Sequence, residues 1–201
     1  DTLDAIDENA AMAAEGGAAW LTIHGRTRVA GYAPPIHWAP IGRVRERLGL
    51  PVVANGDIWT LDDFRRCRDV TGCTHFMLGR GALADPRLAR RVAAELGLGC
   101  GAGGTPAPQP DDENRPVPWA AHLRSLVEWS HRYGMLRSDK DVSRLKQWLR
   151  LASQFGSFPH FDRVKRLERV SELFAELDRA DEGSSHTSAA TAGASALVPS
   201  A

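Results

Sequence analysis

The sequence predicts an α/β fold with parallel strands over residues 1–98, followed by an all-helical segment. Short apolar runs that suit buried strands occur at 20–23, 50–54 and 74–78, and they alternate with stretches whose apolar residues recur at helical spacing. The connections between them are short, which favours parallel βαβ units. Beyond residue 118 only helical patterns occur, so we expect an α/β part joined to an all-α part.

The first two helices of the α/β part are indicated by apolar periodicity and by glycines at their ends. Residues 1–16 show one apolar face, and Gly16 and Gly17 should stop that helix. A second helix precedes Gly49, and Pro51 then opens the second strand. The residues expected to face inward are Leu3, Ile6, Ala10, Ile41, Val44 and Leu48.

The next two helices have clear capping signals. Thr60 is the expected N-cap of the third helix, with Asp63 placed to complete the cap and Gly72 to end the helix. Asp85 followed by Pro86 predicts the start of the fourth helix. The inward-facing residues expected here are Phe64, Cys67, Leu88, Val92 and Leu96.

Three strand–helix units are too few to close a barrel. A (β/α)₈ barrel, or TIM barrel, needs eight strands and about 250 residues. The sequence also has no initiator Met and opens on a helical pattern at Asp1. We therefore expect residues 1–98 to be the C-terminal part of a TIM barrel, with five strands preceding Asp1 in the parent protein.

The composition changes three times after the α/β part. Residues 99–118 are rich in Gly, Ala and Pro and predict an exposed linker. Residues 119–178 predict three amphipathic helices in a small bundle. Residues 179–201 have few large apolar residues and predict a disordered tail. The bundle's apolar positions are Leu123, Leu126, Val127, Leu145, Trp148, Leu149, Ala152, Val164, Leu167, Val170, Phe174 and Leu177.

Glycine-containing polar turns follow all three strands. Carboxyl ends of parallel strands meet at one edge of a sheet, and Gly-rich turns expose the backbone N–H groups that bind phosphate. In a complete barrel, the loops after the last two strands usually hold phosphate. Each turn could also be a plain structural turn, and a single His is often structural. The candidate site residues are His24, Asn55, Gly56, Asp57, Gly79 and Arg80.

The charges are unevenly distributed although the formal net charge is zero. Residues 137–169 hold nine Lys or Arg against four Asp or Glu. Such a surface suits a polyanion such as RNA, or it is a solvated helix face. Cys67, Cys73 and Cys100 lack metal-ligand spacing and predict reduced thiols in a cytoplasmic protein without a metal site. No apolar run reaches the length needed to cross a membrane.

Three motifs together resemble the tRNA-dihydrouridine synthase family. They are Ile23–Arg28 (IHGRTR), Pro51–Ile58 (PVVANGDI) and Met77–Leu83 (MLGRGAL), in the order of the last three strands of that family's barrel. Gly31 with Tyr32, and Arg144–Leu149 (RLKQWL), resemble the C subtype, which reduces a uridine of the tRNA D-loop (the dihydrouridine(16) type). The resemblance extends over about residues 1–178.

The resemblance implies an enzyme that binds FMN, takes hydride from NADPH and reduces the C5–C6 bond of a tRNA uridine. Gly79 and Arg80 would then hold the FMN phosphate. The turn at 55–57 would reach the ribityl chain and phosphate, and His24 the phosphate or the flavin ring. In the helical segment, phosphate contacts would come from cations. The expected RNA-binding cations are Arg144, Lys146 and Lys165. Tyr32, on a loop at the barrel rim, would stack on an RNA base or else pack under its own loop.

No catalytic residue is assigned within this chain. The family's catalytic cysteine lies in a Gly-Cys-Pro-like motif of the N-terminal half, and none of the three cysteines here has that context. We therefore expect the fragment alone to be inactive. Two other functions are compatible with the residues. One is an FMN barrel oxidoreductase acting on a small molecule, like dihydroorotate dehydrogenase, and the other is a non-catalytic RNA-binding scaffold.

Overall fold

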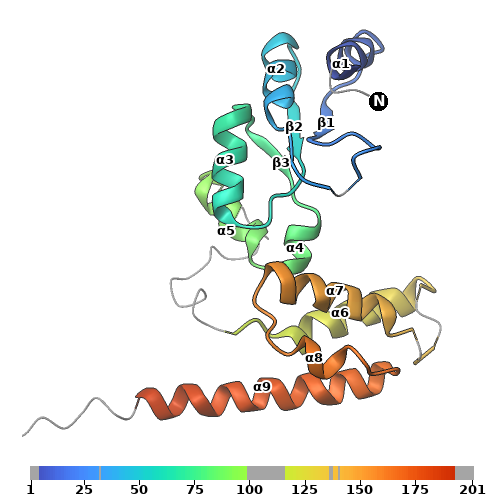
Figure 1. The fold of residues 1–201 in the computed structure, drawn as a ribbon, viewed down its shortest axis with the longest axis vertical. Coiled ribbons are helices and arrows are strands. Elements are labelled where there is room, and N and C mark those ends of the chain that lie inside the picture. Colours follow the sequence, from blue (N-terminus) through green and yellow to red (C-terminus); the bar gives the residue numbers. More distant parts are fainter. Residues whose placement is uncertain (1–4, 32, 99–115, 136–137, 140, 193–201) are drawn as a thin grey trace, which may run out of the picture. The chain divides into compact units, whose positions relative to one another are not determined.

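The computed structural model of the chain describes residues 5–31, 33–98, 116–135, 138–139 and 141–192 (Figure 1). The chain divides into two compact units, Asp1–Pro110 and Asp111–Ala201. Each unit has its own hydrophobic core. None of the helices in the described ranges combines the length and apolar character that a bilayer-spanning helix requires.

A parallel three-stranded sheet organises the first unit. Its strands are β1 (Leu21–His24), β2 (Val52–Asn55) and β3 (His75–Met77), in the spatial order β1-β2-β3. The register pairs His24 with Asn55 and Asn55 with Met77, so the three carboxyl ends are level. The predicted parallel strand–helix alternation is confirmed for the described residues.

Four helices cover this sheet: α1 (Ala5–Glu15), α2 (Ala39–Arg47), α3 (Leu61–Thr71) and α5 (Leu88–Glu95). Figure 1 shows α2 and α3 side by side, and α1 contacts α2. Phe64 of α3 is fully buried and meets Phe76 of β3 edge to face, with ring centroids 4.8 Å apart. The inward-facing positions predicted for Ile41, Val44 and Leu88 are confirmed.

The capping signals of α3 act as the sequence predicts. The Asp63 N–H donates to Thr60 Oγ1 at 3.1 Å, and the Thr60 N–H donates to Asp63 Oδ2 at 3.0 Å. Each residue thus satisfies a backbone donor that the helix leaves free. At the other end, Gly72 adopts the left-handed conformation with a φ of 61°.

The segment after β3 differs from the sequence prediction. Residues 79–82 were expected as a glycine-rich turn, but a short helix, α4 (Arg80–Ala84), begins here with Gly79 at its N-cap. The helix predicted to start at Asp85 begins later, at Leu88. The Asp85 carboxylate nevertheless accepts the N–H of Arg87 at 3.0 Å, so it caps the turn that leads into α5.

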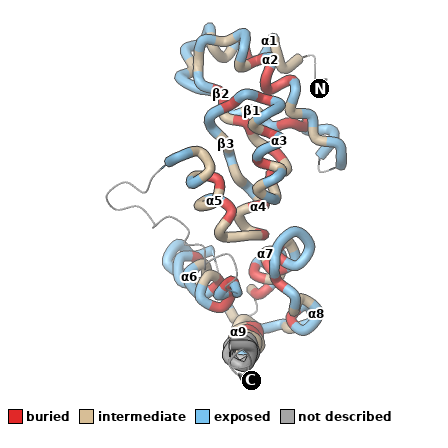
Figure 2. The backbone as a smooth tube through the Cα atoms, turned by 90° about the vertical axis from the view of Figure 1, so that its left-hand side faces the viewer, coloured by how far each residue is buried: buried red, intermediate tan, exposed pale blue. Residues whose placement is uncertain are grey.

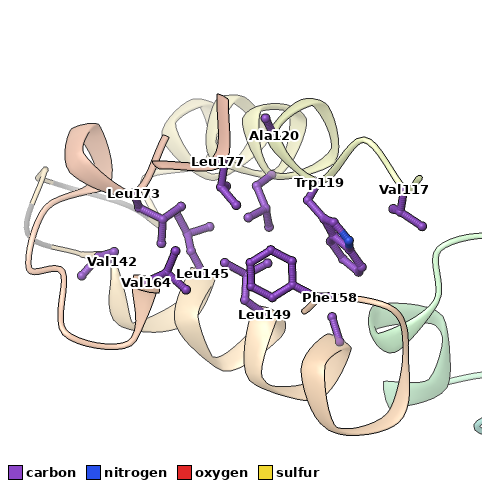
Figure 3. Close-up of a cluster of buried hydrophobic side chains, with 12 residues drawn as sticks. Val117, Trp119, Ala120, Val142, Leu145, Leu149, Phe158, Val164, Leu173 and Leu177 are labelled. Carbon is purple, nitrogen blue, oxygen red and sulfur yellow. The ribbon is translucent and has the colours of Figure 1, made fainter. Parts of the chain in front are cut away.

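The second unit is helical, with α6 (Trp119–Arg132), α7 (Ser143–Phe155), α8 (Phe161–Val164) and α9 (Val170–Ala192). Figure 2 shows buried positions gathered on one side of α6 and of α7. Figure 3 shows Trp119, Leu149 and Phe158 converging in the core that these helices enclose. Val117, which the sequence placed in the linker, is also buried in this core.

The third predicted helix of the bundle is broken in two, α8 and α9. Tertiary contacts satisfy the backbone at the break. The Val170 N–H donates to the backbone carbonyl oxygen of Asp139 at 2.7 Å. The Ser171 N–H donates to the Asp139 carboxylate at 2.8 Å. The Lys146 ammonium donates to the carbonyl oxygens of Lys165 at 3.3 Å and Leu167 at 2.9 Å. Periodicity alone does not show that partners elsewhere in the chain stabilise such an interruption.

The tail prediction is wrong for the residues up to Ala192. We expected disorder from residue 179, but α9 continues as a helix to Ala192. The expectation counted only the large apolar side chains that a core needs. A helix satisfies its backbone locally, and alanine, frequent between 180 and 192, is the best helix former. Residues 193–201 lie outside the described residues.

We expect Thr60→Ala to lower the free energy of unfolding of the first unit by about 1 kcal/mol, because the substitution removes the acceptor for the Asp63 N–H. Urea denaturation followed by circular dichroism measures this difference. Thr60→Ser keeps the hydroxyl and should retain most of the stability. Equal losses in both variants would show that the methyl group, rather than the cap, stabilises α3.

Candidate functional site

The predicted site residues of the first unit meet at the carboxyl edge of the sheet. His24 and Asn55 end neighbouring strands in register, and Gly79, two residues after the end of β3, is the N-cap of α4. The Asn55 side-chain amide also contacts Met77, with 3.2 Å between Nδ2 and Sδ. The parallel register therefore brings turns that are far apart in sequence to one edge, as the strand pattern predicts.

Asp57 connects the three turns. Its carboxylate forms an ion pair with Arg26, which follows β1. The second carboxylate oxygen, Oδ1, accepts a hydrogen bond from Arg80 Nη2 at 3.1 Å. Asp57 has a φ of 48°, in the left-handed region that non-glycine residues seldom adopt. Such backbone conformations persist where surrounding contacts fix them, and here two ion pairs do so.

Arg26 is buried, but its guanidinium is only partly satisfied. The side chain is 3% exposed, and Nη2 is bound to Asp57. Nε and Nη1 have no hydrogen-bond partner among the described residues. A buried donor without an acceptor costs about 1–3 kcal/mol, and more when it is charged. Arg26 and His24 line a cavity of about 360 Å³ between α1 and β1, so an acceptor could reach this cluster.

The His24 imidazole lies in a positive environment. Its pKa is lowered, mainly by burial and next by the Arg26 charge, while Asp57 opposes the shift and Arg80 adds to it. The Arg26 backbone N–H donates to His24 Nδ1 at 3.1 Å. The neutral ring therefore carries its proton on Nε2 and can donate it to a ligand.

Two glycines allow the turns to approach this closely. Gly56 has a φ of 119°, and a Cβ there would lie 2.7 Å from Ile36 Cδ1 and 3.2 Å from His24 Cε1. A Cβ on Gly81 would lie 2.0 Å from the carbonyl oxygen of Ile58. Glycine at 81 thus allows α4 to pack closely against Ile58, in the segment that follows β2. This packing places Arg80 beside Asp57.

Two tryptophans also shape this edge, and sequence reasoning gave neither of them a site role. The Arg80 guanidinium lies 5.0 Å from the Trp59 ring centroid, in a cation–π contact. Trp38 Nε1 donates to the carbonyl oxygen of Gly56 at 3.0 Å. The IHGRTR motif did place the guanidinium of Arg26 at this edge, although Arg26 was not among the candidate cofactor residues.

The predicted RNA-binding residues lie in different surroundings from one another. Arg144 is exposed on α7. Lys146 instead binds backbone carbonyls at the end of α8, and Lys165 forms an ion pair with Asp162. Lys146 and Lys165 therefore already bind partners within the second unit. Tyr32 lies outside the described residues.

The described thiols are unsuited to catalysis. Cys67 and Cys73 are both buried, and burial raises the pKa of Cys67 to about 12 and raises that of Cys73. Such thiols stay protonated at neutral pH. Cys100 lies outside the described residues. Within the described ranges, no three His, Cys, Asp or Glu side chains gather as they would around a metal ion.

The fold and the site define an α/β protein with parallel strands and a positively charged cluster at the strands' carboxyl ends. A family model described as dihydrouridine synthase matches residues 1–107. The chain belongs to the dihydrouridine synthase family.

Several similar curated proteins are named tRNA-dihydrouridine(16) synthase. The protein from Aquipseudomonas alcaligenes is 39% identical over 168 residues, which cover 81% of this chain and 49% of the relative. The protein from Pseudomonas putida is 37% identical, with 90% of this chain and 49% of the relative covered. The protein from Neisseria meningitidis serogroup B is 33% identical, with 86% and 50% covered. The chain spans about half the length of these relatives.

We expect the pKa of His24 to lie below 6.5 and to fall further in Asp57→Asn, which removes the charge that raises it and leaves both guanidiniums. NMR titration of the ring signals measures this pKa. In the unfolded chain His24 has its ordinary pKa, so it is protonated at a higher pH than in the folded chain. The free energy of unfolding should therefore decline as the pH falls below 6.5.

Arg26→Met is the reciprocal variant, and it should raise the pKa of His24 by removing a nearby positive charge. A His24 pKa that moves in neither variant would contradict the electrostatic coupling of this cluster.

Proposed function

We propose that this chain is the C-terminal part of a flavin-dependent tRNA-dihydrouridine synthase that acts on uridine 16 in the cytoplasm. Residues 1–98 would form the last three βα units of its (β/α)₈ barrel, and residues 119–178 a helical tRNA-binding domain. The family match and the name shared by the relatives support this function. The span of about half of each relative supports an upstream part that completes the barrel.

The cluster of Arg26, Asp57 and Arg80 carries the proposal for the cofactor. These three side chains hold two positive charges and one negative charge, and two nitrogens of Arg26 have no acceptor among the described residues. An anionic ligand would balance the excess charge and could supply acceptors. The phosphate of FMN is a dianion and fits this requirement, since charge-assisted hydrogen bonds to guanidinium groups are strong.

The neighbouring groups fit the rest of an FMN molecule. Arg80 and the backbone N–H groups after Gly79 would hold the phosphate, and Asn55 and Gly56 would contact the ribityl chain. His24 would donate from Nε2. FMN supplies the redox chemistry when bound, passing hydride from NADPH to the C5–C6 bond of the uridine. The residues of this chain would bind and orient the cofactor and adjust the charge around it.

The described cysteines of this chain are unsuited to protonate the reduced uracil. Cys67 and Cys73 are buried, with raised pKa values. We infer that the catalytic acid belongs to the upstream part of the protein. The chain expressed alone would then have neither the complete flavin site nor the acid.

The relatives favour tRNA over the other substrates that the sequence left open. Their similarity continues through the helical unit, because the P. putida match covers 90% of this chain. A barrel acting on a small molecule would have no need of the cation-rich stretch at 137–169 that follows it. Exposed Arg144 and Arg150 on α7 have no ion pair in the described part of the chain and could contact tRNA phosphates.

We expect the protein produced from its complete gene to form dihydrouridine at position 16 of a tRNA transcript when it is given NADPH. Mass spectrometry of nuclease digests measures the product and its position. A transcript with cytidine at position 16 is the matched control and should gain no dihydrouridine. Product at another uridine would contradict the position, and no product in the presence of bound flavin would contradict the reaction.

In the same complete protein, Arg80→Ala should weaken FMN binding by about 1.5–3 kcal/mol, because it removes a charge-assisted contact to the phosphate. Flavin absorbance after gel filtration and titration of the apoprotein with FMN measure the loss. Arg47→Ala is a suitable control, since Arg47 is an exposed arginine of α2 that pairs with Asp7. Undiminished FMN affinity in Arg80→Ala would rule out the phosphate role.

A further inference from the structure

The end of α6 carries two large aromatic rings exposed to solvent. Trp129 is 53% exposed and Tyr133 67% exposed. They lie one helical turn apart and stack in parallel, with centroids separated by 5.7 Å and planes inclined by 7°. Neither ring belongs to the core of the second unit. Core packing therefore does not explain why the rings of Trp129 and Tyr133 are exposed to solvent.

A positive charge accompanies the stack. The Arg132 guanidinium lies 5.2 Å from the Trp129 ring centroid, in a cation–π contact. In the described part of the chain no carboxylate forms an ion pair with Arg132. The surface thus offers flat apolar faces next to an uncompensated cation.

The backbone beneath Tyr133 is fixed by the way α6 ends. The Met135 N–H donates to the Ser130 carbonyl oxygen at 2.7 Å, and the Gly134 N–H donates to that of His131 at 3.1 Å. Gly134 has a φ of 66°, which completes a Schellman motif. Little backbone freedom remains at the ring positions, so a ligand would bind to a surface that is already ordered.

We propose that the stack formed by Trp129, Tyr133 and Arg132 binds an unpaired base of the RNA substrate. A base is a flat π-system attached to a phosphate, and proteins bind unpaired bases by combining aromatic faces with cations. The parallel rings and the neighbouring guanidinium have both features. This inference rests on the proposed function, and it adds a site for a base to the phosphate contacts expected of Arg144.

Salt dependence separates a stacking contact from a phosphate contact. In the complete protein, Tyr133→Ala should weaken binding of the tRNA transcript roughly five- to 150-fold, the range that base–aromatic stacking contributes. The slope of the logarithm of affinity against that of salt concentration should stay unchanged. Arg144→Ala should instead reduce that slope by up to about 0.9, or by less on single-stranded RNA. Tyr133→Phe keeps the ring and should bind like the wild type.

Filter binding over a salt series, with circular dichroism to verify folding, measures these effects. Wild-type affinity in Tyr133→Ala, alongside normal dihydrouridine formation, would overturn the stacking site and leave the proposed function standing. Equal weakening of RNA binding in Tyr133→Phe and in Tyr133→Ala would also overturn the stacking site, because the hydroxyl group rather than the ring would then supply the contact. Loss of self-association in Tyr133→Ala with unchanged RNA affinity would assign the surface to a protein contact. A wild-type protein that does not bind tRNA would overturn both proposals.

Discussion

A single carboxylate holds the polar edge of the first unit together. Asp57 follows β2 and binds a guanidinium from the turn after β1 and another from α4, after β3. The turn geometry around it is consistent with this role, since the positive φ of Asp57 and the glycine at 56 turn the chain sharply at the end of the strand. One negative charge cannot neutralise two positive ones. The same interaction that fixes the three turns therefore leaves the edge attractive to an anion.

Local features of this fold could be predicted from the sequence, whereas features that depend on distant partners could not. The capping pair of Thr60 and Asp63 lies within one turn, so the pattern alone indicated it. The break before α9 depends on Asp139, which is 32 residues from Ser171. Lys146 looked like a surface cation because its carbonyl partners are about 20 residues away. Candidate residues followed from the strand ends, but the burial of Arg26 and its unsatisfied nitrogens required coordinates.

The two units present different chemistry to a ligand. The first offers a buried guanidinium, a neutral imidazole with a lowered pKa and an open cavity beside β1. The second offers exposed arginines and a rigid aromatic surface at the end of α6. The proposed function would use this division, because it requires a small anionic cofactor to be kept in place while a large polyanion binds and leaves. Buried pairing favours retention, whereas exposed cations give contacts that salt readily weakens.

The close approach of Gly81 to Ile58 also constrains how the sequence can evolve. The atom that a Cβ at 81 would meet is the backbone carbonyl oxygen of Ile58, 2.0 Å away. A clash with a side chain can be relieved by a compensatory mutation of that side chain, but a clash with a carbonyl oxygen cannot, because every residue type carries one. The carbonyl clash therefore does not depend on which side chain residue 58 carries. A substitution at 81 would have no single-site suppressor at position 58.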